Sequence, residues 1–274
     1  MPDVEHSSGT VLTGRPPFVD FSHVSKNFGF EPNVVEAVRD ISLTIREGEF
    51  ITLVGPSGCG KSTLLSMLAG IYAPSAGQIT RAGRPIEPFS GQVGYMTQND
   101  HLLPWRTVAQ NIAVPLEIRN LSSREAKLRT DELMRFVGLV DFAKSYPSQL
   151  SGGMRKRTVL ARLLAQDADT FLLDEPFAAL DAQLRLRLQI ELRRITRELN
   201  KTTLFVTHDL EEAIALGDRC VVFSPRPGTI KRIIEIGLPR DRDLLRLRHD
   251  PAYIALTTQL WDEMAPLIES EGDR

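Results

Sequence analysis

The sequence EFITLVGPSGCGKSTLLSMLAG, from Glu49 to Gly70, predicts a strand, a loop and a helix in succession. Residues 49–54 are mostly apolar and β-branched and end at a glycine, a pattern that predicts a buried strand. Residues 61–70 have the apolar spacing of a helix and also end at a glycine. The segment between them, Gly55 to Ser62, fits the phosphate-loop pattern G-x-x-x-x-G-K-[ST]. Because the pattern lies after a predicted strand and before a predicted helix, its context supports the match.

This loop predicts binding of nucleotide phosphates. Its glycines let the backbone curl so that N–H groups point inward, and the helix N-terminus adds positive potential. Lys61 supplies a point charge for the β- and γ-phosphates, and the Ser62 hydroxyl can ligate Mg²⁺. The alternative is a glycine-rich turn with a surface lysine. The residues expected to hold ATP here are Gly55, Pro56, Ser57, Gly58, Cys59, Gly60, Lys61, Ser62 and Thr63.

A second motif is an apolar run that ends in two carboxylates. Residues 170–173 (TFLL) predict a buried strand, and Asp174 and Glu175 follow it directly. Asp174 would hold Mg²⁺ from the side opposite Ser62, directly or through water. Glu175 would lie nearer the γ-phosphate and polarise the attacking water. An ordinary strand end is the alternative, and the phosphate loop is what favours the functional interpretation.

Composition narrows the class of protein. The chain has 274 residues, with 33 Lys and Arg against 35 Asp and Glu, so its net charge is −2. This balance argues against a nucleic-acid binder that works by bulk positive charge. Two cysteines are too few for a disulfide scaffold and favour a reducing compartment. The uncharged stretch 62–80 is interrupted by glycine, proline and polar residues, so we do not expect a membrane span.

The remaining pattern is one of strands alternating with helices, which predicts an α/β fold with a mostly parallel sheet and an N-terminal antiparallel β region. A capping box around Ser122 marks one helix start within a mainly helical subdomain over about 100–165. The other expected helix covers 182–199. The other expected strands are 18–24, 34–45, 78–84, 92–97, 202–207, 219–224 and 229–236.

The sequence LSGGM, residues 150–154, lies between the phosphate loop and the acidic strand. Here the chain resembles the ATP-binding cassette (ABC) ATPases, whose signature motif is usually LSGGQ. Ser151 and the amides of Gly152 and Gly153 at a helix start can form a second anion site. In the family, each signature caps the γ-phosphate bound by the partner's phosphate loop, so the resemblance implies a dimer with a second copy. Met154 departs from the usual glutamine, and some importer ATPases of the family also carry methionine there.

The resemblance extends over roughly residues 18–236 and adds four candidate site residues. Gln98 matches the family's glutamine loop, which touches Mg²⁺ and the membrane partner, and Asp181 matches a loop that crosses the dimer interface. His208 matches the switch histidine at the γ-phosphate, and Phe28 aligns with the aromatic residue that stacks on adenine. The alternatives are a surface glutamine, a helix cap, a histidine without function and a core phenylalanine.

A finer resemblance comes from LLPWRTV at 102–108 and DAQ at 181–183. Both are similar to the bacterial importer ATPases for nitrate, sulfonates and taurine. The resemblance implies an ATPase that uses ATP and Mg²⁺, works beneath transmembrane permease subunits at the cytoplasmic face of the inner membrane, and depends indirectly on a periplasmic solute-binding protein. Trp105 is expected where the permease's coupling helix docks, or else it is a structural tryptophan. The implied organisation is a tail over 1–17, an ATPase domain over 18–237 and a helical extension over 238–274.

Two rival functions follow from the same residues. The first is a soluble cassette of DNA repair or ribosome function. Such proteins usually carry coiled-coil or zinc insertions or a second cassette, whereas this chain has one cassette, two cysteines and no long heptad run. The second is a GTPase, since residues 200–203 begin like the guanine-reading motif N-K-x-D. Thr203 stands where that motif needs its aspartate, which disfavours a GTPase.

Overall fold

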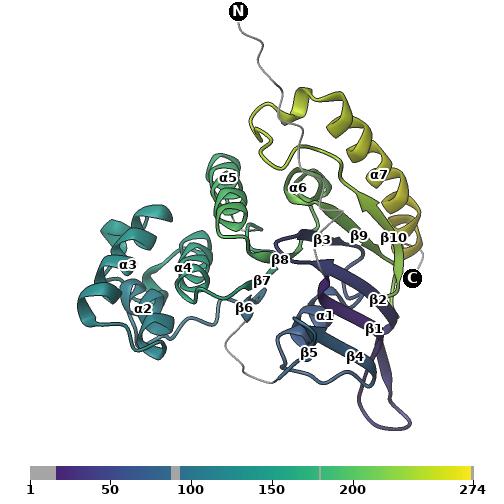
Figure 1. Ribbon diagram of the computed structural model, residues 1–274, viewed down its shortest axis with the longest axis horizontal. Helices are drawn as coiled ribbons and strands as arrows, with labels where there is room; N and C mark the ends of the chain where they lie inside the picture. Colours follow the sequence, from purple (N-terminus) through teal and green to yellow (C-terminus); the bar gives the residue numbers. More distant parts are fainter. Residues whose placement is uncertain (1–16, 88–92, 179, 273–274) are drawn as a thin grey trace, which may run out of the picture.

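The computed structural model describes residues 17–87, 93–178 and 180–272. All of the expected N-terminal tail except Pro17 lies outside these residues, as does residue 92 of the strand expected over 92–97. The described chain contains a six-stranded sheet, a four-stranded sheet and helices packed around them (Figure 1).

The larger sheet is mostly parallel and forms the centre of the molecule. Its strands are β3 (Phe50–Val54), β6 (Val93–Met96), β7 (Thr170–Asp174), β8 (Thr202–Val206), β9 (Arg219–Phe223) and β10 (Ile230–Glu235). They follow the order β10-β9-β3-β8-β7-β6, in which the edge strand β10 runs antiparallel to β9 and the others run parallel. Strands β3, β7, β8 and β9 are buried at every residue, because both faces of a parallel sheet are covered.

The smaller sheet is antiparallel, as expected. Two of its strands have other bounds than those predicted from the sequence. It consists of β1 (Pro17–Phe28), β2 (Val35–Arg46), β4 (Ala76–Arg81) and β5 (Arg84–Pro85), in the order β2-β1-β4-β5. Strand β1 continues beyond Val24 because its pairing with β2 persists to Phe28. The single strand expected over 78–84 is wrong: Ala82 and Gly83 adopt positive φ (48° and 73°) and turn the chain between β4 and β5.

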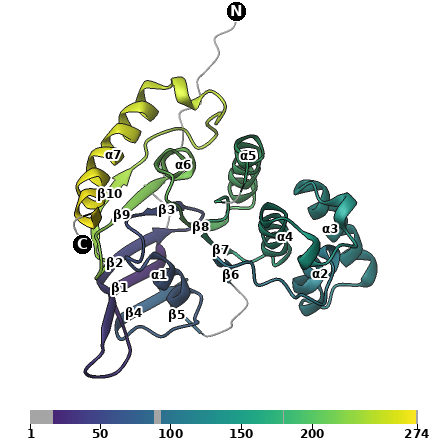
Figure 2. The ribbon, with the colours of Figure 1, turned by 180° about the vertical axis from the view of Figure 1, so that it is seen from behind.

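Three helices form a block on one flank: α2 (Val108–Ile118), α3 (Ser123–Phe136) and α4 (Gly152–Ala165). Figures 1 and 2 show this block on the side of the sheet opposite α7 (Pro251–Gly272). The capping box predicted at Ser122 is confirmed, because its hydroxyl accepts from the Glu125 N–H and the Glu125 carboxylate accepts from the Ser122 N–H. Residues 100–107 precede α2 without helical structure.

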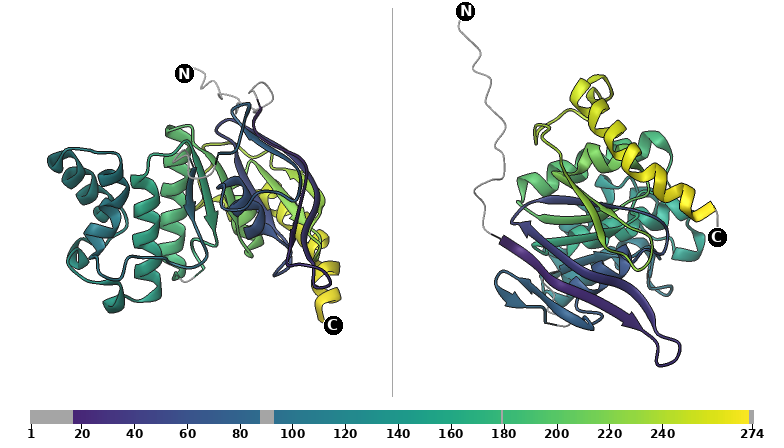
Figure 3. Two further views of the ribbon diagram at one scale, coloured as in Figure 1. Left: turned by 90° about the horizontal axis from the view of Figure 1, so that it is seen from below. Right: turned by 90° about the vertical axis from the view of Figure 1, so that its right-hand side faces the viewer.

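The other helices cover the large sheet. Helix α1 (Lys61–Leu68) shares one buried core with both sheets, which places it between them. Helix α5 (Ala182–Glu198) was expected, whereas α6 (Leu210–Leu216) was not. Helix α6 packs with β9, β10 and α7 in a separate core, and Figure 3 shows α7 running along this side of the molecule. The C-terminal segment becomes α-helical only at Pro251.

Several candidate site residues lie at one edge of the large sheet. The phosphate loop follows β3, Asp174 ends β7, and Gln98 and His208 come shortly after β6 and β8. Because parallel strands place their carboxyl ends at one edge, these groups converge although the sequence separates them widely. Within the residues that the structure describes, no helix is both long and apolar enough to cross a membrane.

Candidate functional site

The phosphate loop takes a backbone path that glycine permits. Gly58 and Gly60 have φ of 71° and 100°, in the left-handed region that side chains disfavour. A Cβ at Gly60 would also lie 2.3 Å from Cγ1 of Val38, so the loop packs tightly against β2 there. At Gly58 a Cβ would meet no atom within 4 Å, so this part of the loop faces open space. The loop is therefore packed on one side and accessible on the other.

Helix α1 differs from its neighbours at its N-terminus. Side chains cap α2, α3, α4, α5 and α6, whereas the described residues provide no side-chain cap for α1, which begins after Gly60 in the left-handed conformation. The first N–H groups of a helix need partners and carry partial positive charge. The start of α1 therefore offers unpaired donors to an anion.

Lys61 lies within the loop and is only 9% exposed. Its ammonium donates to the carbonyl oxygens of Gly55 and Pro56, each at 2.7 Å, and lies 3.4 Å from Sγ of Cys59. These contacts hold the ammonium at the loop. Its partners there are two carbonyl oxygens and a sulfur, and none of the three is a carboxylate. The ammonium is thus placed to exchange weak carbonyl contacts for charge-assisted bonds to phosphate oxygens.

Asp174 is a buried carboxylate at the end of β7, 3% exposed. Burial raises its pKa above the ordinary value and the neighbouring Glu175 adds to the rise, while a hydrogen bond from Ser62 and the charges of Lys61 and Lys156 oppose it. The ionised form therefore gains from a cation nearby. The Ser62 hydroxyl and the Asp174 carboxylate are hard oxygen donors in contact, a set that fits Mg²⁺.

Glu175 has a strained backbone at the centre of the site. Its φ is 50°, and its N–H bonds to the carbonyl of Val206 on the neighbouring strand at 3.0 Å. Strain of this kind in a non-glycine residue is typical of functional sites. Gln98 donates from Nε2 to one Glu175 carboxylate oxygen at 3.4 Å, and Nδ1 of His208 lies 3.6 Å from the other. Gln98 and His208, both predicted from the sequence, thus meet around the carboxylate of Glu175.

Ser151 and its glycines lie in a different part of the molecule. The Ser151 hydroxyl caps α4 by accepting from the Met154 N–H at 3.3 Å. Helix α4 packs against α2, α3 and β6, whereas α1 packs against β2, β7 and β8 (Figure 3). The two candidate anion sites therefore belong to separate blocks of one chain. Asp181 likewise caps a helix, accepting from the Leu184 N–H of α5 at 2.9 Å.

Phe28 ends β1 and is half-buried. Its ring packs at right angles to Tyr72, with centroids 5.3 Å apart, and the Lys26 ammonium lies 5.1 Å from the Phe28 centroid. The Lys26 ammonium also donates to the carbonyl of Ala73 at 2.8 Å. The ring is thus part of a partly exposed aromatic pair that reaches the segment after α1.

Sequence reasoning missed two residues that shape the site. Gly228 lies beneath the phosphate loop, where a Cβ would come within 1.8 Å of the carbonyl oxygen of Cys59. In the sequence it looks like an ordinary turn glycine in SPRPGT, so no pattern could have found it. Lys156 of α4 donates to the carbonyl of Gln98 and so connects the signature helix to the glutamine loop. Its position five residues after Ser151 was the one available signal.

Comparison with known families supports one assignment. The model of the family described as ABC transporter matches residues 38–178. The ABC transporter ATP-binding protein YtlC of Bacillus subtilis is 40% identical over 260 residues, covering 93% of this chain and 98% of its own. The aliphatic sulfonates import ATP-binding protein SsuB of Bacillus cereus is 42% identical over 224 residues, covering 82% and 88%. The nitrate import protein NrtC of Synechococcus elongatus is 44% identical over 82% of this chain, which spans 34% of NrtC.

Solved structures show the same fold. The ATP-binding cassette MJ0796, as a dimer in a post-hydrolysis state with ADP and phosphate, superposes with a TM-score of 0.73 at 28% identity. The match covers 80% of this chain and 98% of that one. A second dimeric structure of that cassette gives a TM-score of 0.75 over the same shares.

Proposed function

Since the chain belongs to the ABC transporter family and is an ATPase of that family, we propose that it is the ATP-hydrolysing subunit of an importer for a small solute. The observation that carries the ATPase site is the meeting of Gln98, Glu175 and His208 beside the phosphate loop. The import-type relatives for sulfonates and nitrate support the transport direction and a nitrate-, sulfonate- or taurine-like solute.

ATP binding is assigned to the open side of the phosphate loop. The uncapped start of α1 would receive the phosphates, and Lys61 would neutralise the β- and γ-phosphate charge. Adenine would stack on the ring of Phe28. Ser62 and Asp174 would hold Mg²⁺, with Gln98 beside them. When bound, this ion offsets negative charge between the phosphates and the two acids.

Hydrolysis is assigned to the residues around Glu175. Its carboxylate would accept a proton from the attacking water, the usual role of a general base. Gln98 and His208 would orient the water and the γ-phosphate, because both already contact that carboxylate. The positive φ of Glu175 sets the direction of its Cα–Cβ bond, and the contacts of Gln98 and His208 lie at its carboxylate.

A second copy of the chain would complete each site. Ser151, Gly152 and Gly153 lie on the helical block, away from their own phosphate loop, so they would cap the γ-phosphate held by the other copy. Asp181 would lie at the same interface. The dimeric MJ0796 cassettes support this arrangement.

A permease would dock on a groove between α2, α4 and β6. The groove has a volume of about 600 Å³ and is lined by Tyr95, Val114, Ile118 and Leu163 among others. Trp105 precedes α2 and is 70% exposed, next to the Arg106–Glu117 ion pair at 2.7 Å. Such an exposed tryptophan is typical of a protein contact. The chain would then lie peripherally at the cytoplasmic face of the membrane, with a solute-binding protein acting on the far side.

Co-expression with tagged permease subunits tests this proposal against a cassette of DNA repair or ribosome function. The chain should copurify with the permease, and Trp105→Ala should weaken the association. Trp261→Ala is the matched control, since this tryptophan is also exposed but lies on α7. A chain that hydrolyses ATP and never associates with its permease would contradict the importer assignment.

A further inference from the structure

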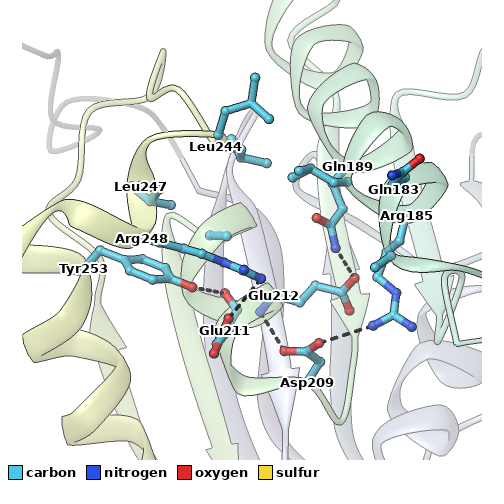
Figure 4. Close-up of a pocket in the computed structure, with 14 residues that line it drawn as sticks. Gln183, Arg185, Gln189, Asp209, Glu211, Glu212, Leu244, Leu247, Arg248 and Tyr253 are labelled. Carbon is cyan, nitrogen blue, oxygen red and sulfur yellow. Dashed lines mark hydrogen bonds and ion pairs between the residues drawn. The ribbon is translucent and has the colours of Figure 1, made fainter.

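Helices α5 and α6 and the C-terminal segment enclose a pocket of about 330 Å³ (Figure 4). Arg185 and Gln189 of α5 line one side, and Asp209 and Glu212 at the start of α6 line another. Figure 4 shows these polar side chains turned toward one another, Gln189 toward Glu212 and Arg185 toward Asp209. The pocket borders the loop that carries His208, because Asp209 follows this histidine directly.

Glu212 is the buried member of this group, with 7% of its surface exposed. One of its carboxylate oxygens accepts from Nε2 of Gln189 at 2.7 Å, and the other accepts from the Thr207 hydroxyl. Burial raises the pKa of Glu212 above its ordinary value, and these two hydrogen bonds oppose the rise. A buried carboxylate is costly unless it is hydrogen-bonded, so the two donors fix its position.

Thr207 and Asp209 flank His208 and are both bonded to this group. The Thr207 hydroxyl also accepts from the Asp209 N–H at 3.0 Å, and the Asp209 carboxylate caps α6 through the Glu212 N–H at 3.0 Å. The loop at His208 is therefore fixed from both sides, while the His208 side chain itself stays 69% exposed.

Arg185 connects the His208 loop to the loop that carries Asp181. One of its Nη atoms lies 3.5 Å from the Asp209 carboxylate, and the other donates to the carbonyl of Leu180 at 3.1 Å. Leu180 directly precedes Asp181. The five residues Arg185, Gln189, Thr207, Asp209 and Glu212, here called the α5–α6 clasp, thus join the two ends of the His208 loop to α5 and to the residue before Asp181.

We propose that the α5–α6 clasp sets the position of His208 relative to Asp181, and that Glu212 is a positioning residue for ATP hydrolysis. This inference rests on the proposed function, in which Asp181 faces the second copy. A shift of the Asp181 loop when two copies close would pass to His208 through α5 and Glu212. Binding of ATP to a single chain would not need the clasp.

Thr207→Val tests the proposal because it removes the hydroxyl with almost no change in volume. We expect kcat to fall by about 10- to 100-fold, the range for a misplaced catalytic group, while the Kd for ATP stays within about twofold. Thr207→Ser keeps a hydroxyl and should retain most of the activity. Thr196→Val is the matched control, because Thr196 is also buried and its hydroxyl donates within α5 to the carbonyl of Arg193, its one partner in the described part of the chain.

Gln189→Met gives a second, independent reading. It detaches α5 from Glu212 while the Thr207–Glu212 bond remains, and methionine suits a helix interior. We expect a loss in kcat again, and the double variant with Thr207→Val should be slower than the slower single variant by no more than about twofold, because both changes break one connection.

The outcomes separate the inference from the function on which it rests. Unchanged kcat in both variants, or an equal loss in Thr196→Val, would overturn the clasp while normal hydrolysis by the parent chain upholds the ATPase. Multiplying losses in the double variant would also overturn it. A parent chain that neither binds nor hydrolyses ATP would overturn the proposed function itself.

Discussion

Two helices of this chain begin at a candidate anion site, and they begin in different ways. Helix α1 starts after Gly60 with no side-chain cap among the described residues and is enclosed by both sheets. Helix α4 starts at Gly152 with its N-terminus capped by Ser151 and belongs to the helical block. The first site has its lysine, its acids and its open donors in one chain. In the proposed function, the second would act on a phosphate held by the other copy.

The largest expected effect concerns the acids beside α1. Glu175→Gln keeps the shape of the side chain and removes its basicity, so hydrolysis should fall by about 10²–10⁴-fold while ATP still binds. Phosphate release and a direct binding assay measure the two quantities separately. A variant that hydrolyses ATP at the parent rate would remove Glu175 from the role of base.

Lys61→Ala should weaken ATP binding by about a hundredfold or more, because charge-assisted bonds to two phosphates are lost and the loop contains no other cation. Titration calorimetry with ATP measures the affinity. Lys127→Ala is the control, since that lysine is exposed on α3 and pairs there with Asp131 at 2.7 Å. Parent affinity in Lys61→Ala would contradict the assignment of phosphates to this loop.

Phe28→Ala should weaken nucleotide binding by about 1–3 kcal/mol, the scale of base–aromatic stacking, and Phe28→Tyr should be nearly silent. The thermal midpoint serves as the control, because the ring also contacts Tyr72. If alanine lowers the midpoint and leaves ATP affinity intact, Phe28 is a packing residue and adenine lies elsewhere.

Ser151→Ala should have the smallest effect on a single chain. Loss of the cap costs about 1 kcal/mol of stability, and ATP affinity should not change because the phosphate loop is untouched. Thermal unfolding and the same binding titration measure both. A loss of ATP affinity in the isolated chain would mean that α4 contacts the ATP bound by the phosphate loop of the same chain. The two helices would then serve one site, contrary to the comparison above.

The same contrast explains what the sequence could predict. The phosphate loop is contiguous, so the pattern of Gly55 to Ser62 predicts both a turn and the ligand expected there. The buried strands before Gly55 and Asp174 were recognisable because apolar, β-branched runs persist over their whole length. Helix α6 was missed because seven residues are too few to show a helical period.

Contacts between distant residues were not predictable in the same way. Gln98 and His208 are predicted by resemblance and Glu175 by the acidic end of its strand, but the distances among them follow from the order of β6, β7 and β8 in the sheet. Two contacts arise only when distant elements pack together. One is the close approach of Gly228 to the carbonyl of Cys59, and the other is the hydrogen bond from Gln189 to Glu212. Neither leaves a local pattern, because the partners come from different elements.

Two copies that share two ATP molecules would change mass when the nucleotide binds. Light scattering of Glu175→Gln with and without ATP reports the mass of the species in solution. We expect a monomer without nucleotide and a dimer with ATP, because the ligand favours the form that binds it. Adding Ser151→Arg should restore the monomer by blocking the γ-phosphate of the other copy. A Glu175→Gln chain that binds ATP and stays monomeric at saturation would contradict the shared site.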